Sequence, residues 1–264
     1  MTPAVVATLL RSPAARGALR RALPRGRVRI RSCRRPAALE RVLATALADG
    51  VVVDPRMPGA LDVLGRLRAT YPGVPRFVYA PFRPDEAELL AACVRGAGAH
   101  PLVEGVEDAI LGDLILPRTA SAVRLATLAA APRLLRLTDP LQEAAWREVM
   151  QRVGGRLRTT DIAASLGVSR EHLSRQFGAG GAPNLKRVID LARAVTAADL
   201  LANPGYTVRG VARILGFASA SHLSGAARRV AGVTARGLTV LGPDGVLGAF
   251  LRGRMRSRSW AAAR

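Results

Sequence analysis

A repeated segment limits the folds open to this chain more than any other feature. The string IAASLGVSREHLSRQF at residues 162–177 returns, with one extra residue in its middle, as VARILGFASASHLSGA at residues 211–226. Each copy has an alanine (Ala163, Ala212) followed four positions later by a glycine (Gly167, Gly216). A small alanine lets two helices cross closely, and glycine accepts the positive φ of a tight turn. Both copies therefore predict a helix-turn-helix unit.

Hydroxyl side chains stand where the helices of each copy are expected to begin. Thr160 and Thr207 are placed to cap the first helix of their copies, and Ser169 and Ser219 the second. A side-chain oxygen at this position accepts a hydrogen bond from an otherwise unpaired backbone N–H. The pattern predicts four capped helices.

Residues 184–202, between the two copies, predict a long connecting helix. Leu185, Val188, Ile189, Ala192 and Val195 recur at helical spacing, and a Pro-Gly pair ends the pattern. A helix of this length spans about 28 Å at about 1.5 Å per residue. Successive major grooves on one face of B-DNA lie about 34 Å apart. The spacing predicts one chain that presents two recognition helices to adjacent grooves.

The charge of the chain is consistent with a polyanionic partner. The formal net charge is +21 at pH 7, and a basic surface gains free energy from counterion release on binding DNA. Because Lys186 is the only lysine, a bias toward arginine in the whole composition contributes to this total, so the distribution is more informative. Residues 1–118 carry a net charge of +7 and residues 119–264 of +14. We expect the second half to contact the polyanion.

The first half alternates short β-rich runs with longer helical patterns, which predicts a parallel sheet flanked by helices. Candidate strands occupy 4–10, 27–30, 51–54, 76–80 and 101–104. Two helices should follow, the second capped by Asp139 with Pro140 in its first turn. The predicted architecture is an α/β unit with a flavodoxin-like sheet, followed by an all-α unit. The expected divisions are an α/β domain at 1–118, a helical linker at 119–137, a double helix-turn-helix domain at 138–240 and a loosely ordered basic tail at 241–264.

Several classes of protein are disfavoured by what the sequence does not contain. It has no run of eighteen apolar residues, and arginines are scattered through its first thirty, so we expect a cytoplasmic protein without membrane contact. Cys33 and Cys93 lack the spacing of a disulfide framework or a zinc site. No convergent catalytic residues and no glycine-rich phosphate loop are evident, so neither an enzyme nor a cofactor is expected.

The repeated segments, together with RAVTAADLL at 193–201 and the Gly-Phe pair at 216–217, resemble the AraC/XylS-type DNA-binding domain over roughly residues 138–240. The resemblance implies two helix-turn-helix units joined by a long helix. It also implies base-reading positions on both second helices. In the first copy these are Glu171, Ser174 and Arg175, and in the second Ala220, Ser221, Ser224 and Gly225.

The residues at these positions predict different roles for the two units. Arg175 can bond in bidentate fashion to guanine and Glu171 can accept from cytosine, with a good bidentate contact worth about 1–3 kcal/mol of discrimination. In the second copy only Ser221 and Ser224 offer polar groups. We therefore expect the first unit to specify bases and the second mainly to hold phosphates. The candidate phosphate contacts are Thr160, Arg170, Thr207, Arg209, Arg228 and Arg229.

Two plainer interpretations remain open for these helices. Glu171 and Arg175 are four residues apart and could form only an exposed ion pair. His172 and His222 fall at matching positions and could suggest a metal pair, but no cysteine or carboxylate cluster accompanies them. Packing histidines that replace an aromatic residue are the favoured interpretation, and no metal site is expected.

The stretch VVVDPRMPG at 51–59 resembles the receiver domain of response regulators, in which a phosphoacceptor aspartate ends the third strand. Asp54 holds that position over a resemblance of about residues 1–118. Phosphoryl transfer would also need a cation held by further acids, a hydroxyl and a lysine. The first strand ends without an acid, Tyr79 holds the hydroxyl position and Glu104 the lysine position. Asp54 is therefore expected to be a vestigial phosphoacceptor in a degenerate receiver that serves dimerisation or partner contact.

The combined prediction is a sequence-specific transcription regulator of bacterial type. Its expected partners are double-stranded DNA, a second copy bound through the N-terminal domain, and RNA polymerase. Two alternatives stay open: a working, phosphorylated response regulator, and a non-specific nucleic-acid-binding protein whose helices only neutralise phosphates.

Overall fold

The computed structural model describes residues 4–24, 28–178 and 181–261, and it separates into two compact units. The first comprises Met1–Arg124 with Asn203–Gly205, and the second Leu125–Ala202 with Tyr206–Arg264. The division after Arg124 falls inside the segment 119–137 that the sequence analysis assigns to a linker. Each unit is described by itself below.

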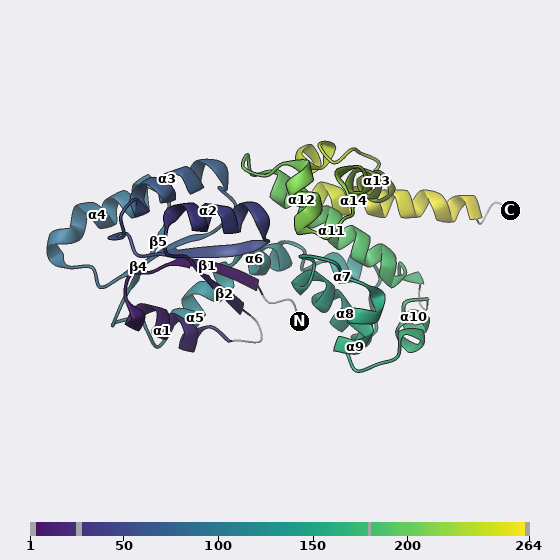
Figure 1. The fold of residues 1–264 in the computed structure, drawn as a ribbon. Coiled ribbons are helices and arrows are strands. Elements are labelled where there is room, and N and C mark those ends of the chain that lie inside the picture. Colours follow the sequence, from purple (N-terminus) through teal and green to yellow (C-terminus); the bar gives the residue numbers. More distant parts are fainter. Residues whose placement is uncertain (1–3, 25–27, 179–180, 262–264) are drawn as a thin grey trace. The chain divides into compact units, whose positions relative to one another are not determined.

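The first unit is built on a five-stranded, all-parallel sheet in the order β2-β1-β3-β4-β5 (Figure 1). This is the flavodoxin-like order, and ligands of such sheets bind beyond the carboxyl ends of the strands. All five strands occur where the sequence predicts them, although Arg27, in one predicted strand, lies outside the described residues. The strands are β1 Ala4–Leu9, β2 Val28–Ser32, β3 Ala48–Val53, β4 Arg76–Ala80 and β5 His100–Val103.

Helices cover both faces of this sheet. In Figure 1, α2 and α3 lie on one face and α1 and α5 on the other. The second face buries a continuous apolar cluster in which Leu19 of α1 and Ile115 of α5 meet Phe77 of β4. The helical segments are α1 Pro13–Ala22, α2 Pro36–Thr45, α3 Ala60–Thr70, η1 Pro84–Glu86, α4 Ala87–Ala91, η2 Ala92–Gly96, α5 Leu111–Ile115 and η3 Leu116–Arg118.

A buried carboxylate holds three parts of the first unit together. Asp49, on β3, is 3% exposed and accepts hydrogen bonds from Val5 N on β1 (2.9 Å) and from Ser121 N (3.1 Å). Ser121 lies in the first turn of α6 (Ala120–Thr127). Burial raises the pKa of Asp49, and the charge of Arg124 and these hydrogen bonds oppose that rise. The start of α6 is thus fixed to the sheet by the Asp49 side chain, in addition to its own cap, in which Thr119 Oγ1 accepts from Ala122 N at 3.3 Å.

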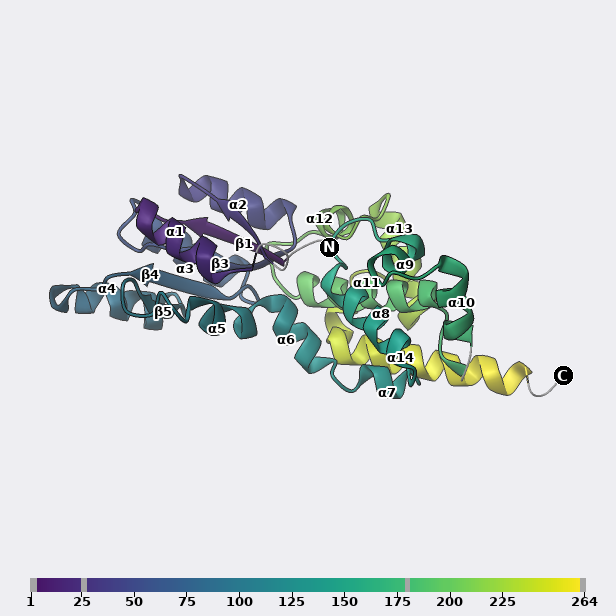
Figure 2. The ribbon, with the colours of Figure 1, turned by 90° about the horizontal axis from the view of Figure 1, so that it is seen from below.

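The second unit is helical throughout its described residues. Its helices run from the shared segment α6 to a long terminal helix, drawn in yellow in Figure 2, and Figure 1 shows α11 lying between α8–α10 and α12–α14. Asp139 accepts from Leu141 N (2.8 Å) at the start of α8, which confirms the predicted cap, and Pro140 is the first helical residue. The helices are α7 Ala131–Leu134, α8 Pro140–Gln151, α9 Thr159–Ser165, α10 Arg170–Gly178, α11 Leu185–Leu201, α12 Val208–Ile214, α13 Ala220–Ala231 and α14 Gly237–Ala261.

The connecting helix α11 is more buried than its sequence pattern indicates. The predicted apolar stripe from Leu185 to Val195 is buried, but Leu191, Ala194 and Ala197, outside that stripe, are buried as well. Helices α8, α12, α13 and α14 all pack against α11, so it has neighbours on several sides. It is the core of the second unit rather than a solvent-exposed rod.

Two sequence expectations differ from the structure at the ends of the second unit. The predicted helix over 119–137 is broken between α6 and α7, where Pro132 lacks an N–H group and lies in the first turn of a new helix. Residues 241–261 belong to α14 rather than to a loosely ordered tail, and residues 262–264 lie outside the described part. Helix α14 bends at Gly242 (φ 64°, ψ 176°), immediately before Pro243. In the described part of the chain, no helix is long and apolar enough to span a membrane.

Candidate nucleic-acid interface

Both repeated segments form two helices joined by a tight turn. Gly167 and Gly216 lie in the left-handed region with φ of 67° and 69°, as their sequence positions predict. Ala163 and Ala212 are 3% and 2% exposed, so each brings two helices close together. The extra residue of the second copy lies between Gly216 and the start of α13.

Three of the four predicted caps are present. Ser169 Oγ accepts from His172 N and Ser219 Oγ from His222 N, each at 3.1 Å, and Thr207 Oγ1 accepts from Gly210 N at 3.0 Å. The prediction for Thr160 is wrong. Helix α9 begins at Thr159, and the Asp161 carboxylate accepts instead from Arg158 N at 2.8 Å.

The second helices of the two units, α10 and α13, present equivalent faces. A residue of α10 corresponds to the residue fifty positions later in α13, so Leu173 matches Leu223, and both are buried. At about 100° per residue, Glu171 and Arg175 lie opposite this buried side of α10, as Ser221 and Gly225 do in α13. Glu171, Ser174, Arg175 and Ser221 are exposed, and Ser224 is partly exposed. All five predicted base-reading side chains are therefore accessible.

The two plainer interpretations of these helices have different outcomes. No ion pair joins Glu171 to Arg175, two residues that the structure describes, so their charged groups are not tied to each other. The His222 ring contacts the Phe217 ring edge-on, with 5.7 Å between ring centroids. His222 therefore takes part in aromatic packing. No cluster of three potential metal ligands occurs among the described residues.

Phe217 also contacts a partly buried cation, Arg193 of the connecting helix. The Arg193 guanidinium of α11 lies 5.4 Å from the centroid of the Phe217 ring. Its Nη2 donates to the carbonyl oxygens of Gly155 and Leu157, each at 3.3 Å. Burial lowers the pKa of Arg193, and the charge of Asp190 opposes this shift. Arg193 thus links the segment that precedes α9, the connecting helix α11 and the turn between α12 and α13.

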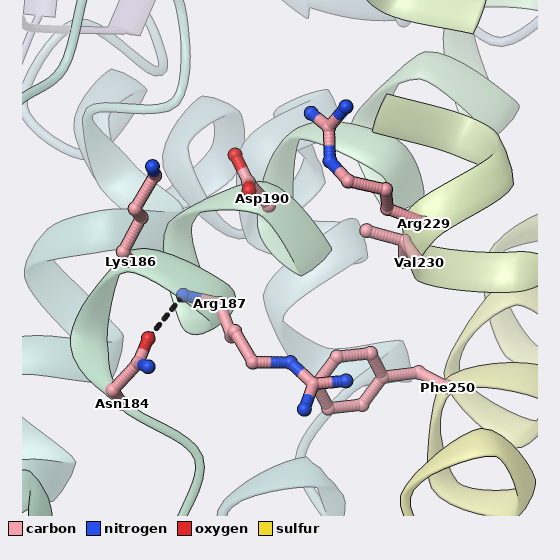
Figure 3. Close-up of a pocket in the computed structure, with 7 residues that line it drawn as sticks. All are labelled: Asn184, Lys186, Arg187, Asp190, Arg229, Val230 and Phe250. Atoms are coloured by element: carbon pink, nitrogen blue, oxygen red, sulfur yellow. Dashed lines mark hydrogen bonds between the residues drawn. The ribbon is translucent and has the colours of Figure 1, made fainter. Parts of the chain in front are cut away.

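The candidate phosphate contacts are exposed but do not share one direction. Thr160, Arg170, Thr207, Arg209, Arg228 and Arg229 all have exposed side chains. On α13, Arg228 falls about 20° from Ser221 around the helix axis, whereas Arg229 falls about 80° from it. Arg229 lines a cavity between α11, α13 and α14 (Figure 3). Arg228 is therefore the better placed of the two to act together with Ser221.

In the first unit, the aspartate that follows β3 already has a cationic partner. Asp54 is 2% exposed, and its Oδ1 accepts from the backbone N (3.0 Å) and from Nε (3.1 Å) of Arg56. A third bond runs from Arg56 Nη2 to Asp54 Oδ2 at 3.3 Å. The hydrogen bond to Asp54 raises the pKa of Arg56, and the charges of Glu86 and Glu104 add to that rise. A guanidinium therefore neutralises the carboxylate to which a phosphoryl group would be transferred.

The other predicted departures from a receiver site also have partners in the structure. Glu104, at the lysine position after β5, accepts from Ser12 Oγ at 3.1 Å. Tyr79, at the hydroxyl position, is fully buried and donates to Asp108 Oδ1 at 2.5 Å. Burial first and this bond second raise the pKa of Tyr79. Every one of these groups is engaged within the protein.

Some of these features are not apparent from the sequence reasoning. Arg56 stands two residues after Asp54, and this short separation is a sequence feature that could indicate the ion pair. The burial of Arg193 and the cavity that Arg229 lines involve Phe217 and Phe250, residues far from them in sequence. No local pattern announces either contact.

Comparison with known proteins locates one family match. Residues 162–238 match the family described as "Helix-turn-helix domain". Among solved structures, full-length FixJ from B. japonicum is similar over 73% of this chain and 97% of that one, at 21% identity and a TM-score of 0.39. At that score the likeness carries no weight, and the flavodoxin-like topology of the first unit rests on its own strand order. A comparison with curated proteins gave no match. The paired turns, the capped second helices and the family match together identify residues 162–238 as a helix-turn-helix domain of the AraC type, the kind with which transcription regulators bind DNA.

Proposed function

We propose that this protein regulates transcription by inserting α10 and α13 into adjacent major grooves of one operator. The observation that carries the proposal is that both helices turn equivalent, exposed faces away from their buried leucines. Glu171, Ser174 and Arg175 read bases in the first groove. The second helix contributes Ser221 and Ser224, and it is held mainly through the backbone phosphates.

The proposed phosphate contacts come from both helix-turn-helix units. Arginine side chains and the N–H groups at helix starts bind phosphates without reading sequence. We assign this role to Thr160, Arg170, Thr207, Arg209, Arg228 and Arg229, with Arg228 the best oriented and Arg229 shared with the neighbouring cavity.

Selection of bound fragments from sheared genomic DNA, followed by footprinting, tests the proposal. The expected footprint covers two protected major grooves about 10 base pairs apart on one face of the duplex. Competition with unrelated duplex at physiological salt separates specific from non-specific binding. If unrelated DNA displaces the best fragment as well as that fragment displaces itself, the protein only neutralises phosphates.

We further propose that the first unit is a receiver-like module that is not phosphorylated and serves dimerisation or contact with a partner such as RNA polymerase. The ion pair between Arg56 and Asp54 supports this, because a guanidinium stands where a divalent cation would have to bind. In addition, the first strand ends without an acid, Tyr79 holds the hydroxyl position and Glu104 the lysine position, so the groups that accompany a phosphoacceptor do not stand where they are needed.

Incubation of the full chain with Mg²⁺ and a small phosphodonor tests this second proposal. We expect intact-mass measurement to detect no added phosphoryl group on the wild-type protein. A gain of one phosphoryl group that Asp54→Asn abolishes would instead show a working response regulator. A gain that persists in Asp54→Asn would point to modification elsewhere and leave Asp54 vestigial.

A further inference from the structure

A cavity of about 410 Å³ opens between α11, α13 and α14 within the second unit (Figure 3). Its walls include Lys186, Arg187 and Asp190 from α11, Arg229 and Val230 from α13, and Phe250 from α14. Sites for small molecules typically enclose about 300–1,000 Å³. The cavity is large enough for a metabolite with one or two rings.

The charges around this cavity favour an anion. Lys186, Arg187 and Arg229 supply three positive charges against the single negative charge of Asp190. None of the three cations is within ion-pair distance of a carboxylate in the described part of the chain. Guanidinium groups bind carboxylates and phosphates through paired N–H donors. An anionic group would therefore find cationic donors that the protein leaves uncommitted.

The cavity also has an apolar wall that orients one of these cations. Val230 and Phe250 are 7% and 2% exposed, and the Arg187 guanidinium lies over the Phe250 ring, 5.1 Å from its centroid. This contact uses the flat face of the guanidinium, while its N–H groups point outward in the guanidinium plane. In Figure 3 the Arg187 guanidinium overlaps the Phe250 ring, and Asn184 Oδ1 accepts from the backbone N of Arg187. Val230 and Phe250 thus form the closed base of the cavity, and the flat surface beside them is the Arg187 guanidinium that covers the ring, with its donors prepositioned.

Asp190 gives the site a second kind of selectivity. Its carboxylate lies between Lys186 and Arg229 in the view of Figure 3, and its charge acts on Arg193 one turn further along α11. It opposes a purely anionic ligand and accepts a hydrogen bond from a hydroxyl or amino group. A ligand that carries both an acidic group and such a donor would satisfy all the polar groups named here.

We propose that this cavity binds a small organic acid, with its carboxylate or phosphate against Arg187 and Arg229 and its flat apolar body over the closed base that Val230, Phe250 and the stacked Arg187 form. A DNA phosphodiester shares the anionic chemistry but would leave the apolar wall unused. Ser221 lies on the proposed DNA-facing side of α13, and Arg229 lies about 80° away from Ser221 around the helix axis. Both observations favour a free small molecule over the DNA backbone.

Calorimetric titration of the full chain, without DNA, tests the site with defined probes. The acids are phenyl phosphate and 2-naphthoate, and the controls are 2-naphthamide, which lacks the charge, and inorganic phosphate, which lacks the ring. We expect at least one acid to bind about tenfold more tightly than either control, since charge-assisted bonds and apolar contact act together. If neither acid binds more tightly than both controls, the proposal is overturned.

Matched variants locate the binding. Arg187→Gln and Arg229→Gln should each weaken the acid about tenfold or more, because each removes charged hydrogen bonds. Asp190→Asn should strengthen binding of these donor-free probes, and Arg228→Gln, one residue outside the cavity, should leave it unchanged. Arg229→Lys retains the charge and should fall between the wild type and Arg229→Gln, and thermal unfolding of each variant shows whether it is folded.

Two outcomes would contradict this assignment. Equal weakening by Arg228→Gln and Arg229→Gln would mean that the acid responds only to general surface charge. Binding of short duplex DNA and inorganic phosphate through Arg229, with no binding of either organic acid, would assign the cavity to the DNA backbone. Because the titrations contain no operator, their failure would leave the proposed regulatory function untouched.

Discussion

The two helix-turn-helix units share one arrangement of helices and turn but have very different exposed chemistry. Where α10 presents Glu171 and Arg175, α13 presents Ser221 and Gly225 at the equivalent positions. The buried positions are closer in kind, since Leu173 and Leu223 both face the core. The two copies thus share their packing position, while their exposed faces differ in chemistry.

The turns of the two helix-turn-helix units differ in how closely the rest of the chain packs against their glycines. A Cβ added at Gly167 would meet nothing within 4 Å. At Gly216 it would lie 2.4 Å from the backbone carbon of Gly155 and 2.5 Å from Arg156 N. The first turn is open to solvent, and the second is pressed against the chain that precedes α9. The unit whose second helix exposes fewer charged groups therefore has the more tightly packed turn.

Alanine at the two turn glycines should show the largest contrast. Gly216→Ala combines a positive φ with a backbone clash and should lower the free energy of unfolding by about 3 kcal/mol or more. Gly167→Ala has only the left-handed strain, about 1–2 kcal/mol. Denaturant unfolding of both variants measures the difference. Equal losses would mean that the turns are equivalent in solution.

Alanine at the matching positions of α10 and α13 should give the second-largest contrast. Arg175→Ala should relax preference at one base position, at a cost of about 1–3 kcal/mol for the preferred operator. Gly225→Ala, at the matching position, removes no hydrogen-bonding group and should leave the preference unchanged. Binding measured against operators with single base-pair changes tests both. A shift of preference in Gly225→Ala alone would reverse the proposed division of labour.

Arg228 should behave as a phosphate contact rather than a reading residue. Arg228→Ala should weaken binding evenly across operator variants and reduce the slope of log K against log salt by about one. Titrations at several salt concentrations give that slope, with Arg175→Ala as the comparison. If both variants alter base preference in the same way, the second unit reads sequence too.

The smallest expected contrast concerns the starts of the first helices. Thr207→Ala removes a cap and should cost about 1 kcal/mol of stability. Thr160→Ala should cost much less, because Thr160 is the second residue of α9 and Asp161 supplies the local hydrogen bond. Thermal unfolding of the two variants compares them. A comparable loss in Thr160→Ala would show that its hydroxyl does stabilise the helix start.

Local signals made much of this fold predictable from sequence. The five strands follow from β-rich runs, and the caps at Asp139, Ser169, Thr207 and Ser219 from hydroxyl and carboxylate positions. The start of α9 differs from the prediction because the helix begins at Thr159, and the Asp161 carboxylate, three residues after Arg158, accepts from Arg158 N. Asp161, rather than the Thr160 hydroxyl, therefore supplies the local hydrogen bond. The break between α6 and α7 was missed although Pro132 marks it.

The candidate sites were predictable only in part, for a physical reason. The exposure of Glu171 and Arg175 follows from helical spacing, which is a property of one segment. The Asp54–Arg56 pair is also local, but which of several arginines would reach the carboxylate depends on the course of the loop. The cavity beside Arg229 depends on where α14 places Phe250, twenty-one residues further along. Contacts of that kind are set by packing and not by a pattern in one stretch.

Arg193 couples the unfolding of the two helix-turn-helix units. Its guanidinium is shared by carbonyls that precede α9 and by the ring of Phe217 after α12, so loosening either side removes partners of a partly buried cation. A partly buried charge that loses its partners is destabilised, which penalises opening of one helix-turn-helix unit alone. The pair should accordingly melt as a single cooperative block, with amide protons of α9, α10, α12 and α13 sharing one slowest exchange rate.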